Sequence, residues 1–135
     1  MEASIEHLDP DGLHKNPAYS QAVAVAGPVK TVYVGGQDAV DSEGNLVGKG
    51  DLKAQSVRAL RNVEAAVIEA GGRLEDVIKW NVFIVEGQPI PLGFEAFREV
   101  WPADAQPPAV TVAMVSGLGN PDYLVEIEAI AVIPS

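Results

Sequence analysis

The chain has 135 residues, 9 of them Lys or Arg and 19 Asp or Glu, with a net charge of −10 and no cysteine. These numbers exclude a disulfide framework and thiolate chemistry, and they argue against nucleic-acid binding, which requires clustered cations. We therefore expect a single domain over residues 1–135 with an acidic surface, long enough to bury a core of its own.

The N-terminal segment predicts neither export nor metal binding. It has no basic start followed by an apolar stretch, and no apolar run in the chain approaches the about 20 residues of a membrane span. Its two histidines, His7 and His14, are not accompanied by other potential ligands at the spacing typical of metal sites. We expect a cytoplasmic protein with surface histidines, no membrane association and no metal or other cofactor.

Strands are predicted in the first third of the chain. A short edge strand fits residues 4–8, and residues 19–26 and 29–34 form two further strands. Gly27-Pro28 between the latter two predicts a hairpin. The strand at 29–34 continues into Gly35-Gly36-Gln37, where two glycines permit close approach of a ligand or a backbone. These residues also suit a simple turn at the end of the strand.

The middle of the chain predicts two helices. Residues 51–70 repeat apolar side chains at i, i+3, i+4 and i+7, with Asp51 suited to cap the start and Gly71-Gly72 to end the helix. The elements expected next are a single helical turn at 74–78, a strand at 79–85 and a helix at 93–100 that Pro102 stops.

The last quarter of the chain predicts two strands connected through a turn at Asn120-Pro121-Asp122. The first, residues 109–115, is apolar on both faces apart from Thr111. The second alternates from Tyr123 to Ile133, so that an uninterrupted apolar face lies opposite a face that carries Glu126 and Glu128.

These elements predict an α+β fold with a mixed sheet and two helices on one face. The other face would then stay apolar at Val110, Val112 and Met114 or at the alternate positions of that strand. An exposed apolar face is a liability for a monomer, so we expect copies of the chain to cover it.

Seven segments, in order from residue 16 to residue 132, resemble the Rid family, formerly called YjgF or L-PSP. They are NPAYSQAV at 16–23, VYVGGQ at 32–37, NVEAAVIEAGG at 62–72, DVIKWNVFI at 76–84, FEAF at 94–97, PPAVTV at 107–112 and VEIEAIAV at 125–132. The resemblance implies a chorismate-mutase-like fold and a homotrimer whose sheets face inward around three clefts between subunits. Members with the full site hydrolyse reactive enamines and imines to ketoacids and ammonia without a metal or cofactor.

One position departs from the pattern of the deaminases in this family. They carry Pro-Ala-Arg where this chain has Pro108-Ala109-Val110, and valine cannot replace the guanidinium group that grips a substrate carboxylate. Gly35 likewise stands where the family has the serine of Ser-Gly-Gln. The resemblance implies a small-molecule site with Glu126 as the catalytic residue and these substrate-binding residues: Tyr19, Gly35, Gly36, Gln37, Val110 and Thr111.

The residues themselves leave two function classes open. A carboxylate among apolar neighbours is costly, so Glu126 should find donors or hold its proton tightly enough to position or protonate a water molecule. It also suits a half-exposed strand carboxylate, and Tyr19 suits either the wall of a cleft or an ordinary strand end. The chain is then either a hydrolase of imine-like substrates other than the ordinary small 2-imino acids, or a non-catalytic metabolite-binding or regulatory trimer.

Overall fold

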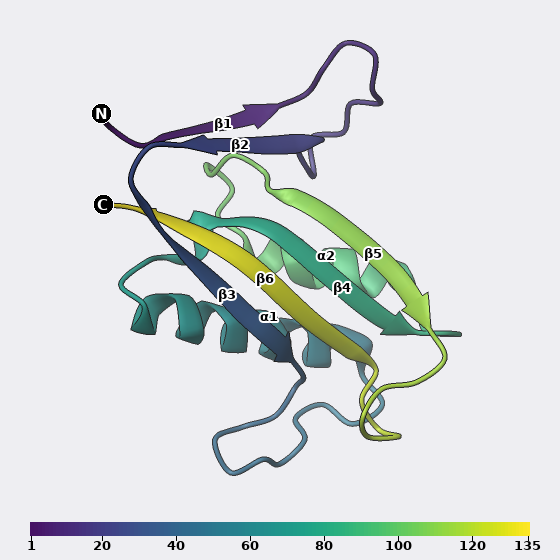
Figure 1. The fold of residues 1–135 in the computed structure, drawn as a ribbon. Helices are drawn as coiled ribbons and strands as arrows, with labels where there is room; N and C mark the ends of the chain where they lie inside the picture. The colour runs from purple at the N-terminus through teal and green to yellow at the C-terminus, as the bar shows by residue number, and fades with distance from the viewer.

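The computed structural model describes residues 1–135 and has two helices packed against one face of a four-stranded sheet (Figure 1). In chain order the elements are β1 (Ser4–Leu8), β2 (Ala22–Ala26), β3 (Val29–Gln37), α1 (Leu52–Glu69), a short 3-10 helix (Leu74–Asp76), β4 (Val77–Val85), α2 (Ile90–Val100), β5 (Ala109–Val115) and β6 (Val125–Pro134). The predicted α+β fold, with helices on one face only, is confirmed.

The sheet has the strand order β3-β6-β4-β5, and β1 pairs with β2 in a separate two-stranded ribbon. β4 and β5 are parallel, whereas β6 is antiparallel to both of its neighbours. The predicted hairpin between residues 19–26 and 29–34 was wrong, because β2 pairs with β1 and β3 pairs with β6. In this pairing with β6, Val34 lies in the core.

Both helices form where the sequence predicts them. Asp51 caps α1 by accepting a hydrogen bond from the Ala54 backbone N–H at 3.0 Å, and the chain turns away at Gly71, whose φ is 98°. The second helix begins at Ile90, three residues earlier than predicted. Pro91 lies in its first turn, where backbone N–H groups have no partner within the helix and a proline therefore costs no hydrogen bond.

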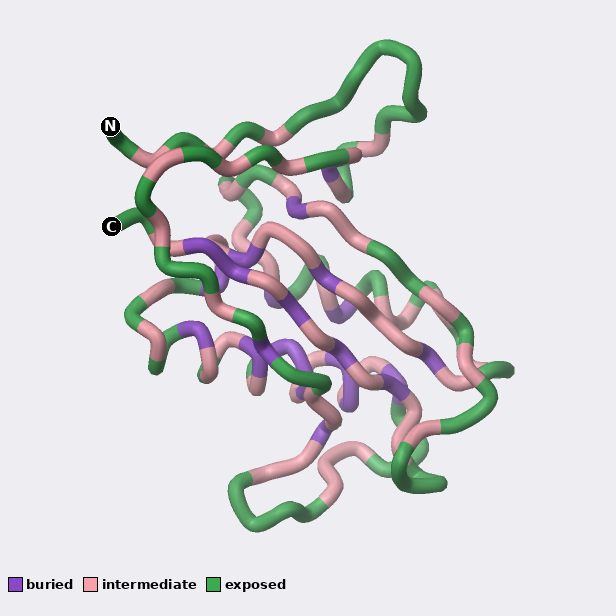
Figure 2. Tube along the Cα trace, viewed as in Figure 1, coloured by how far each residue is buried: buried purple, intermediate pink, exposed green.

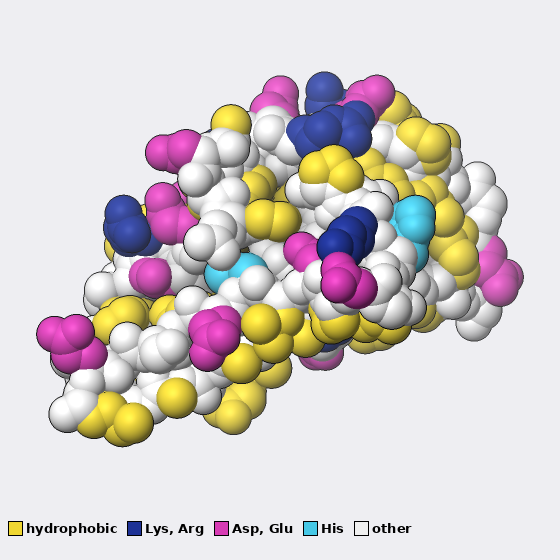
Figure 3. Space-filling view, turned by 90° about the horizontal axis from the view of Figure 1, so that it is seen from above, with side chains coloured by type: hydrophobic (Ala, Val, Ile, Leu, Met, Phe, Trp, Pro, Cys, Tyr) yellow, Lys and Arg dark blue, Asp and Glu magenta, His cyan; other side chains and the backbone are white.

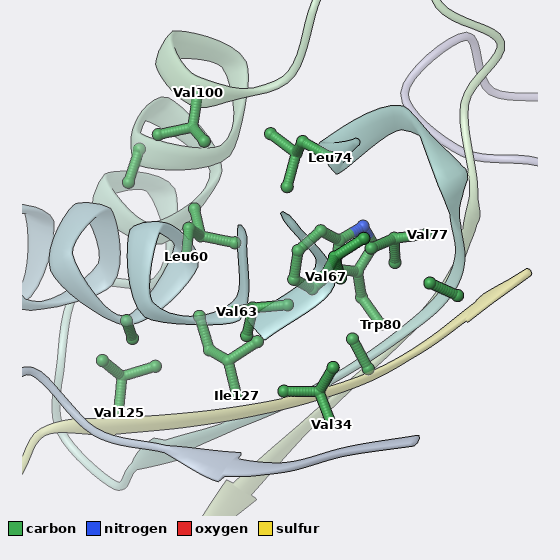
Figure 4. Close-up of a cluster of buried hydrophobic side chains, with 14 of the residues drawn as sticks. Val34, Leu60, Val63, Val67, Leu74, Val77, Trp80, Val100, Val125 and Ile127 are labelled. Carbon is green, nitrogen blue, oxygen red and sulfur yellow. The ribbon is translucent and has the colours of Figure 1, made fainter. Parts of the chain in front are cut away.

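The core lies between the helices and the sheet. Buried residues follow the inner faces of the helices and the centres of β4 and β6, whereas the β1–β2 ribbon has none (Figure 2). Figure 4 shows side chains from both layers meeting, with the Trp80 indole among aliphatic residues of α1 and the sheet. Because Val125 and Ile127 of β6 point into this core, Glu126 lies on the opposite, open face.

The orientation of β5 corrects one prediction. Its register with β4 places Val110, Val112 and Met114 level with core-facing residues of that strand, so all three lie on the helix side. The expectation that these three residues form the open face was wrong, and the alternate positions that the sequence also allowed, Ala109, Thr111, Ala113 and Val115, lie there instead. β5 is apolar on both sides, and its sequence therefore could not show which side meets the helices. The open face is mixed in character, since it carries Tyr33, which is 78% exposed, beside Lys79 and Glu128.

No helix of the structure combines the length and the apolar character that crossing a membrane would require. On the face seen in Figure 3, acidic side chains are scattered between apolar atoms and the Lys and Arg side chains stand in small separate groups.

Candidate functional site

The structure divides the predicted site residues between two places. Tyr19 and Val110 lie together on the helix side of β5, in the wall of a cavity. Gly36, Gln37 and Glu126 lie around the end of β3, on strands that are separated from β5 by β4. With about 4.8 Å between neighbouring strands, β3 and β5 are roughly 14 Å apart. One chain therefore does not bring the whole predicted set together.

Thr111 belongs to neither place. Its side chain projects from β5 on the side opposite Val110, and its hydroxyl accepts a hydrogen bond from Lys79 Nζ at 2.6 Å. The structure thus assigns Thr111 a contact on the open face of the sheet and none in the cavity.

The end of β3 is shaped around the carboxyl group of Glu126. The β3–β6 register shifts between Val34 and Gln37, which displaces the two glycines from regular pairing. A methyl group added at Gly36 would lie 2.6 Å from Glu126 Oε2. The close approach that two glycines were expected to permit is therefore made by a carboxyl group of the chain itself, and Gly36 is the residue that admits it.

Asp38 completes this arrangement, and sequence reasoning missed it. Burial raises the pKa of Asp38 from 3.8 to about 7, and a side-chain hydrogen bond with Glu126 and the charge of Glu126 act in the same direction. Asp38 Oδ1 is buried with no donor facing it, and neither carboxyl group forms an ion pair. Asp38 therefore keeps its proton up to near-neutral pH. We call Asp38 and Glu126 the carboxyl pair.

The backbone around Asp38 is held by the first helix. Asn62 of α1 donates from Nδ2 to the carbonyl oxygens of Asp38 at 3.0 Å and Val40 at 2.9 Å. The Val40 N–H also donates to the Asp38 carbonyl at 2.9 Å. These contacts fix the turn after β3, so the Asp38 side chain approaches Glu126 from a rigid support.

Glu128 has a different environment from Glu126. Its Oε1 accepts a hydrogen bond from Asn81 Nδ2 at 3.1 Å, across the β4–β6 pair. A neutral amide that donates to a half-buried carboxylate accounts for Glu128 as a structural residue. Of the two carboxylates on this strand face, only Glu126 lies against a second carboxyl group.

The second place is an apolar cavity of about 60 Å³ between α2, β4 and β5. Its wall contains no charged residue. The lining residues come from the loop before β2, both helices and three strands: Ala18, Tyr19, Ser56, Leu60, Trp80, Val82, Ile84, Ile90, Gly93, Phe94, Phe97, Val110, Val112 and Ile127. We call it the β5 cavity.

Hydrogen bonds to the start of β5 hold Tyr19 at this cavity. The neighbouring Ser20, which is 2% exposed, donates from Oγ to the Pro107 carbonyl at 2.6 Å and from its N–H to the Pro108 carbonyl at 2.9 Å. His7 Nδ1 lies 2.8 Å from the same Pro107 oxygen, so His7 is half-buried in this contact rather than a free surface histidine. His14 is exposed, as predicted. These contacts place Tyr19 beside Val110.

The arginines of the first helix are engaged elsewhere. Arg61 pairs with Glu64 at 2.9 Å, Arg58 Nε donates to Asn62 Oδ1 at 3.1 Å, and none of the arginines lines the β5 cavity. The structure also has no group of three or more His, Cys, Asp or Glu side chains that could hold a metal ion.

Comparison with known proteins gives the same assignment as the motifs. A family model described as Endoribonuclease L-PSP matches residues 12–133. The chain belongs to the L-PSP family, whose members are also called Rid or YjgF proteins. A RutC family protein from Pyrococcus abyssi is 36% identical over 113 residues, which are 84% of each chain.

Two solved structures with similar sequences share the fold. A conserved Rid-family protein of unknown function from Yersinia pestis, YyfB, is 30% identical with a TM-score of 0.81, covering 94% of this chain and 97% of its own. TdcF from E. coli, determined with bound serine, is 27% identical with a TM-score of 0.67, covering 87% and 95%. The predicted family and fold are thus confirmed.

Proposed function

We propose that this Rid-family protein hydrolyses imine- or enamine-like small metabolites in clefts between three copies of the chain, with Glu126 as the catalytic residue. The observation that carries the proposal is the carboxyl pair, because Asp38 has a pKa of about 7 and lies against Glu126. An acid that titrates near the working pH is suited to proton transfer in both directions.

Hydrolysis of an imine requires the two proton transfers that such a pair can perform. A proton from the pair moves to the imine nitrogen while the oxygen of a water molecule bonds to the carbon, and the pair accepts the proton that this water loses. A second proton then moves from the pair to nitrogen and the hydroxyl group on the carbon returns its proton to the pair, so the C–N bond breaks, ammonia leaves and a carbonyl group remains. One water is consumed, and the pair returns to its starting state.

Assembly of copies accounts for the division of the site residues. Tyr19 and Val110 lie on the helix side of the edge strand β5, and Glu126 lies on the open face two strands away. A cleft between copies, as in the trimer that the family resemblance implies, would place the carboxyl pair of one copy opposite the Tyr19–Val110 region of the next. The cytoplasmic location expected from the sequence fits such a metabolic role.

Val110 determines which substrates the proposal includes. TdcF was determined with bound serine, a ligand that carries a carboxylate. In this chain the wall around Val110 is apolar and uncharged, so a carboxylate placed against Val110 would lose its hydration without gaining a partner. Ordinary 2-iminobutanoate or 2-iminopropanoate deamination should therefore be weak, and uncharged or differently anchored imines are the better substrates. The same apolar wall also suits a trimer that binds a metabolite without turnover.

Ammonia release from imines generated in situ tests the proposal. We expect Glu126→Gln, which preserves size, to lower turnover by about 10²–10⁴-fold. Glu128→Gln is the matched control and should retain turnover, because Glu128 is occupied by Asn81. If wild-type protein binds a metabolite but releases no ammonia, the chain belongs to the binding class. If Glu128→Gln removes activity and Glu126→Gln does not, the catalytic carboxylate has been misassigned.

The family model's name mentions an endoribonuclease, but we do not propose RNA cleavage for this chain. A net charge of −10 opposes binding to a phosphate backbone, and the basic side chains stand in small separate groups on the face seen in Figure 3.

A further inference from the structure

The β5 cavity has a size, a lining and a buried polar group that together define a class of ligand. We propose that it binds an uncharged branched aliphatic group of isopropyl to isobutyl size, attached to a neutral carbonyl or imine. The identity of the whole substrate rests on the proposed function. Binding of the aliphatic group does not, since it requires neither turnover nor the carboxyl pair.

The volume of the cavity limits the group that fits. A dry cavity of about 150 Å³ accommodates a benzene ring, and a single water-sized group needs about 10–15 Å³. The β5 cavity, at about 60 Å³, is therefore too small for an aromatic ring but has room for a few methyl or methylene groups. A branched aliphatic group fills such a space with little loss of rotational freedom.

The lining excludes charge on the buried part of the ligand. Aromatic rings of Trp80, Phe94 and Phe97 and the aliphatic side chains of Val110 and Val112 form much of the wall. No Lys, Arg, Asp or Glu borders the cavity. A carboxylate or ammonium group would lose its hydration there without an opposite charge, whereas an aliphatic group gains from leaving water.

Ser56 supplies one of the two unpaired buried polar groups among the lining residues, the other being the Trp80 indole N–H. Ser56 lines the cavity from α1 and is 2% exposed, and its Oγ has no hydrogen-bond partner. Less than 1 Å² of this oxygen is accessible, so a ligand reaches it when the serine side chain turns toward the cavity, and the contact would then satisfy a hydroxyl group that buried sites normally keep hydrogen-bonded. A neutral carbonyl or imine next to the aliphatic group can accept a hydrogen bond from Ser56, which a pure hydrocarbon cannot.

The opening of the cavity lies at the edge of the sheet. Val112 on the edge strand β5 is 36% exposed, and Tyr19 is half-buried beside it. Tyr19 also carries the only other hydroxyl group in the lining. A ligand can therefore insert its aliphatic end from this edge while its remaining part stays near the surface, where a second copy of the chain would meet it.

Three small probes separate these requirements. Isovaleramide has the branched group and a neutral carbonyl, isovalerate has the same group with a carboxylate, and acetamide lacks the aliphatic group. Binding to the intact protein can be followed by the fluorescence of Trp80, which lies in the wall, and by the rise in melting temperature. We expect isovaleramide to half-saturate at about 1–10 mM and the other two probes to bind at least about tenfold more weakly.

Two variants test whether binding occurs in this cavity. A Cβ at Gly93 would meet only Ile84 Cδ1 at 3.5 Å, so Gly93→Ala is a tolerated control, whereas Gly93→Leu should fill the space and abolish binding. Ser56→Ala should weaken isovaleramide by about 2–10-fold without lowering the melting temperature, since it removes an unpaired buried hydroxyl.

The outcomes distinguish this proposal from the proposed function. Isovalerate binding as tightly as isovaleramide, or unchanged isovaleramide binding in both Gly93→Leu and Ser56→Ala, would overturn the ligand class. Ammonia release that depends on Glu126, without any probe binding, would leave the proposed function standing and refute the cavity. Probe binding without turnover of any imine would refute the proposed function and leave the ligand class of the cavity standing.

Discussion

Replacement of Asp38 by asparagine should make the protein more stable at neutral pH and change its stability little under acid conditions. Burial and the neighbouring Glu126 raise the pKa of Asp38 in the folded state to about 7, from an ordinary value of 3.8 that the unfolded chain should retain. Between these two values the folded state keeps a proton that the unfolded state has lost. The stability that protonated Asp38 contributes to the folded state is therefore fully present below about pH 4 and is lost as the pH rises to about 7.

The size of the effect follows from the same two values. A pKa difference between 3.8 and about 7 corresponds to about 4 kcal/mol if the group is fully shielded. Asp38 is only half-buried, and solvent screening reduces this to about 1–2 kcal/mol. Asparagine has the same shape without the charge. The difference in unfolding free energy between Asp38→Asn and wild type should therefore grow by that amount from pH 4 to pH 8.

Urea denaturation at fixed protein concentration, measured at several pH values between 4 and 8, gives this difference directly. Asp104→Asn is the matched control, because Asp104 is exposed and forms no ion pair. Measuring the effect of Asp38→Asn in the Glu126→Gln background tests its origin. The stability difference that Asp38→Asn makes should depend less on pH there, because Glu126 no longer carries a charge. A stability difference that stays constant or shrinks as the pH rises would refute the reasoning.

Two other substitutions test separate parts of the structure. Val110→Arg should increase ammonia release from imines that carry a carboxylate, because it adds the missing guanidinium group. It should also lower the melting temperature, because it places a charge against an apolar wall. Unchanged activity in the folded variant would contradict this role for Val110. Gln55→Ala should destabilise the protein by about 2–4 kcal/mol. Gln55 is 0% exposed, donates to the Gly48 and Asp122 carbonyls and accepts from the Leu124 N–H, so its loss removes three hydrogen bonds between α1 and the backbone around it. A urea-denaturation change below about 1 kcal/mol would contradict that account.

Local patterns explain what the sequence could predict. The first helix has a continuous apolar stripe, a capping aspartate and a terminal glycine, and all three signals agree with α1. The alternation in the last strand correctly placed Glu126 on the face opposite Val125 and Ile127. These features depend on residues that are neighbours along the chain.

The features that could not be predicted depend on pairing between distant strands. Gly27-Pro28 resembles a hairpin turn, but β3 pairs with β6, a distant strand, and Val34 is buried in that register. β5 is apolar on both sides, so only its register with β4 shows that Val110 faces the helices. Asp38 is a single acid after a strand, a pattern with no signature. Its contact with Glu126 arises from the β3–β6 pairing and from the space left by Gly36.

The central claim is that a working site combines the carboxyl pair of one copy with the Tyr19–Val110 region of another. Mixed assemblies test it most directly, using equal amounts of a Glu126→Gln chain and a Val110→Trp chain, each expected to be inactive alone. In a ring with identical head-to-tail contacts, chance pairing leaves an intact carboxyl pair facing an intact Val110 at about a quarter of the clefts. The account predicts about a quarter of wild-type ammonia release from the mixture, whereas a mixture no more active than its separate components would contradict it.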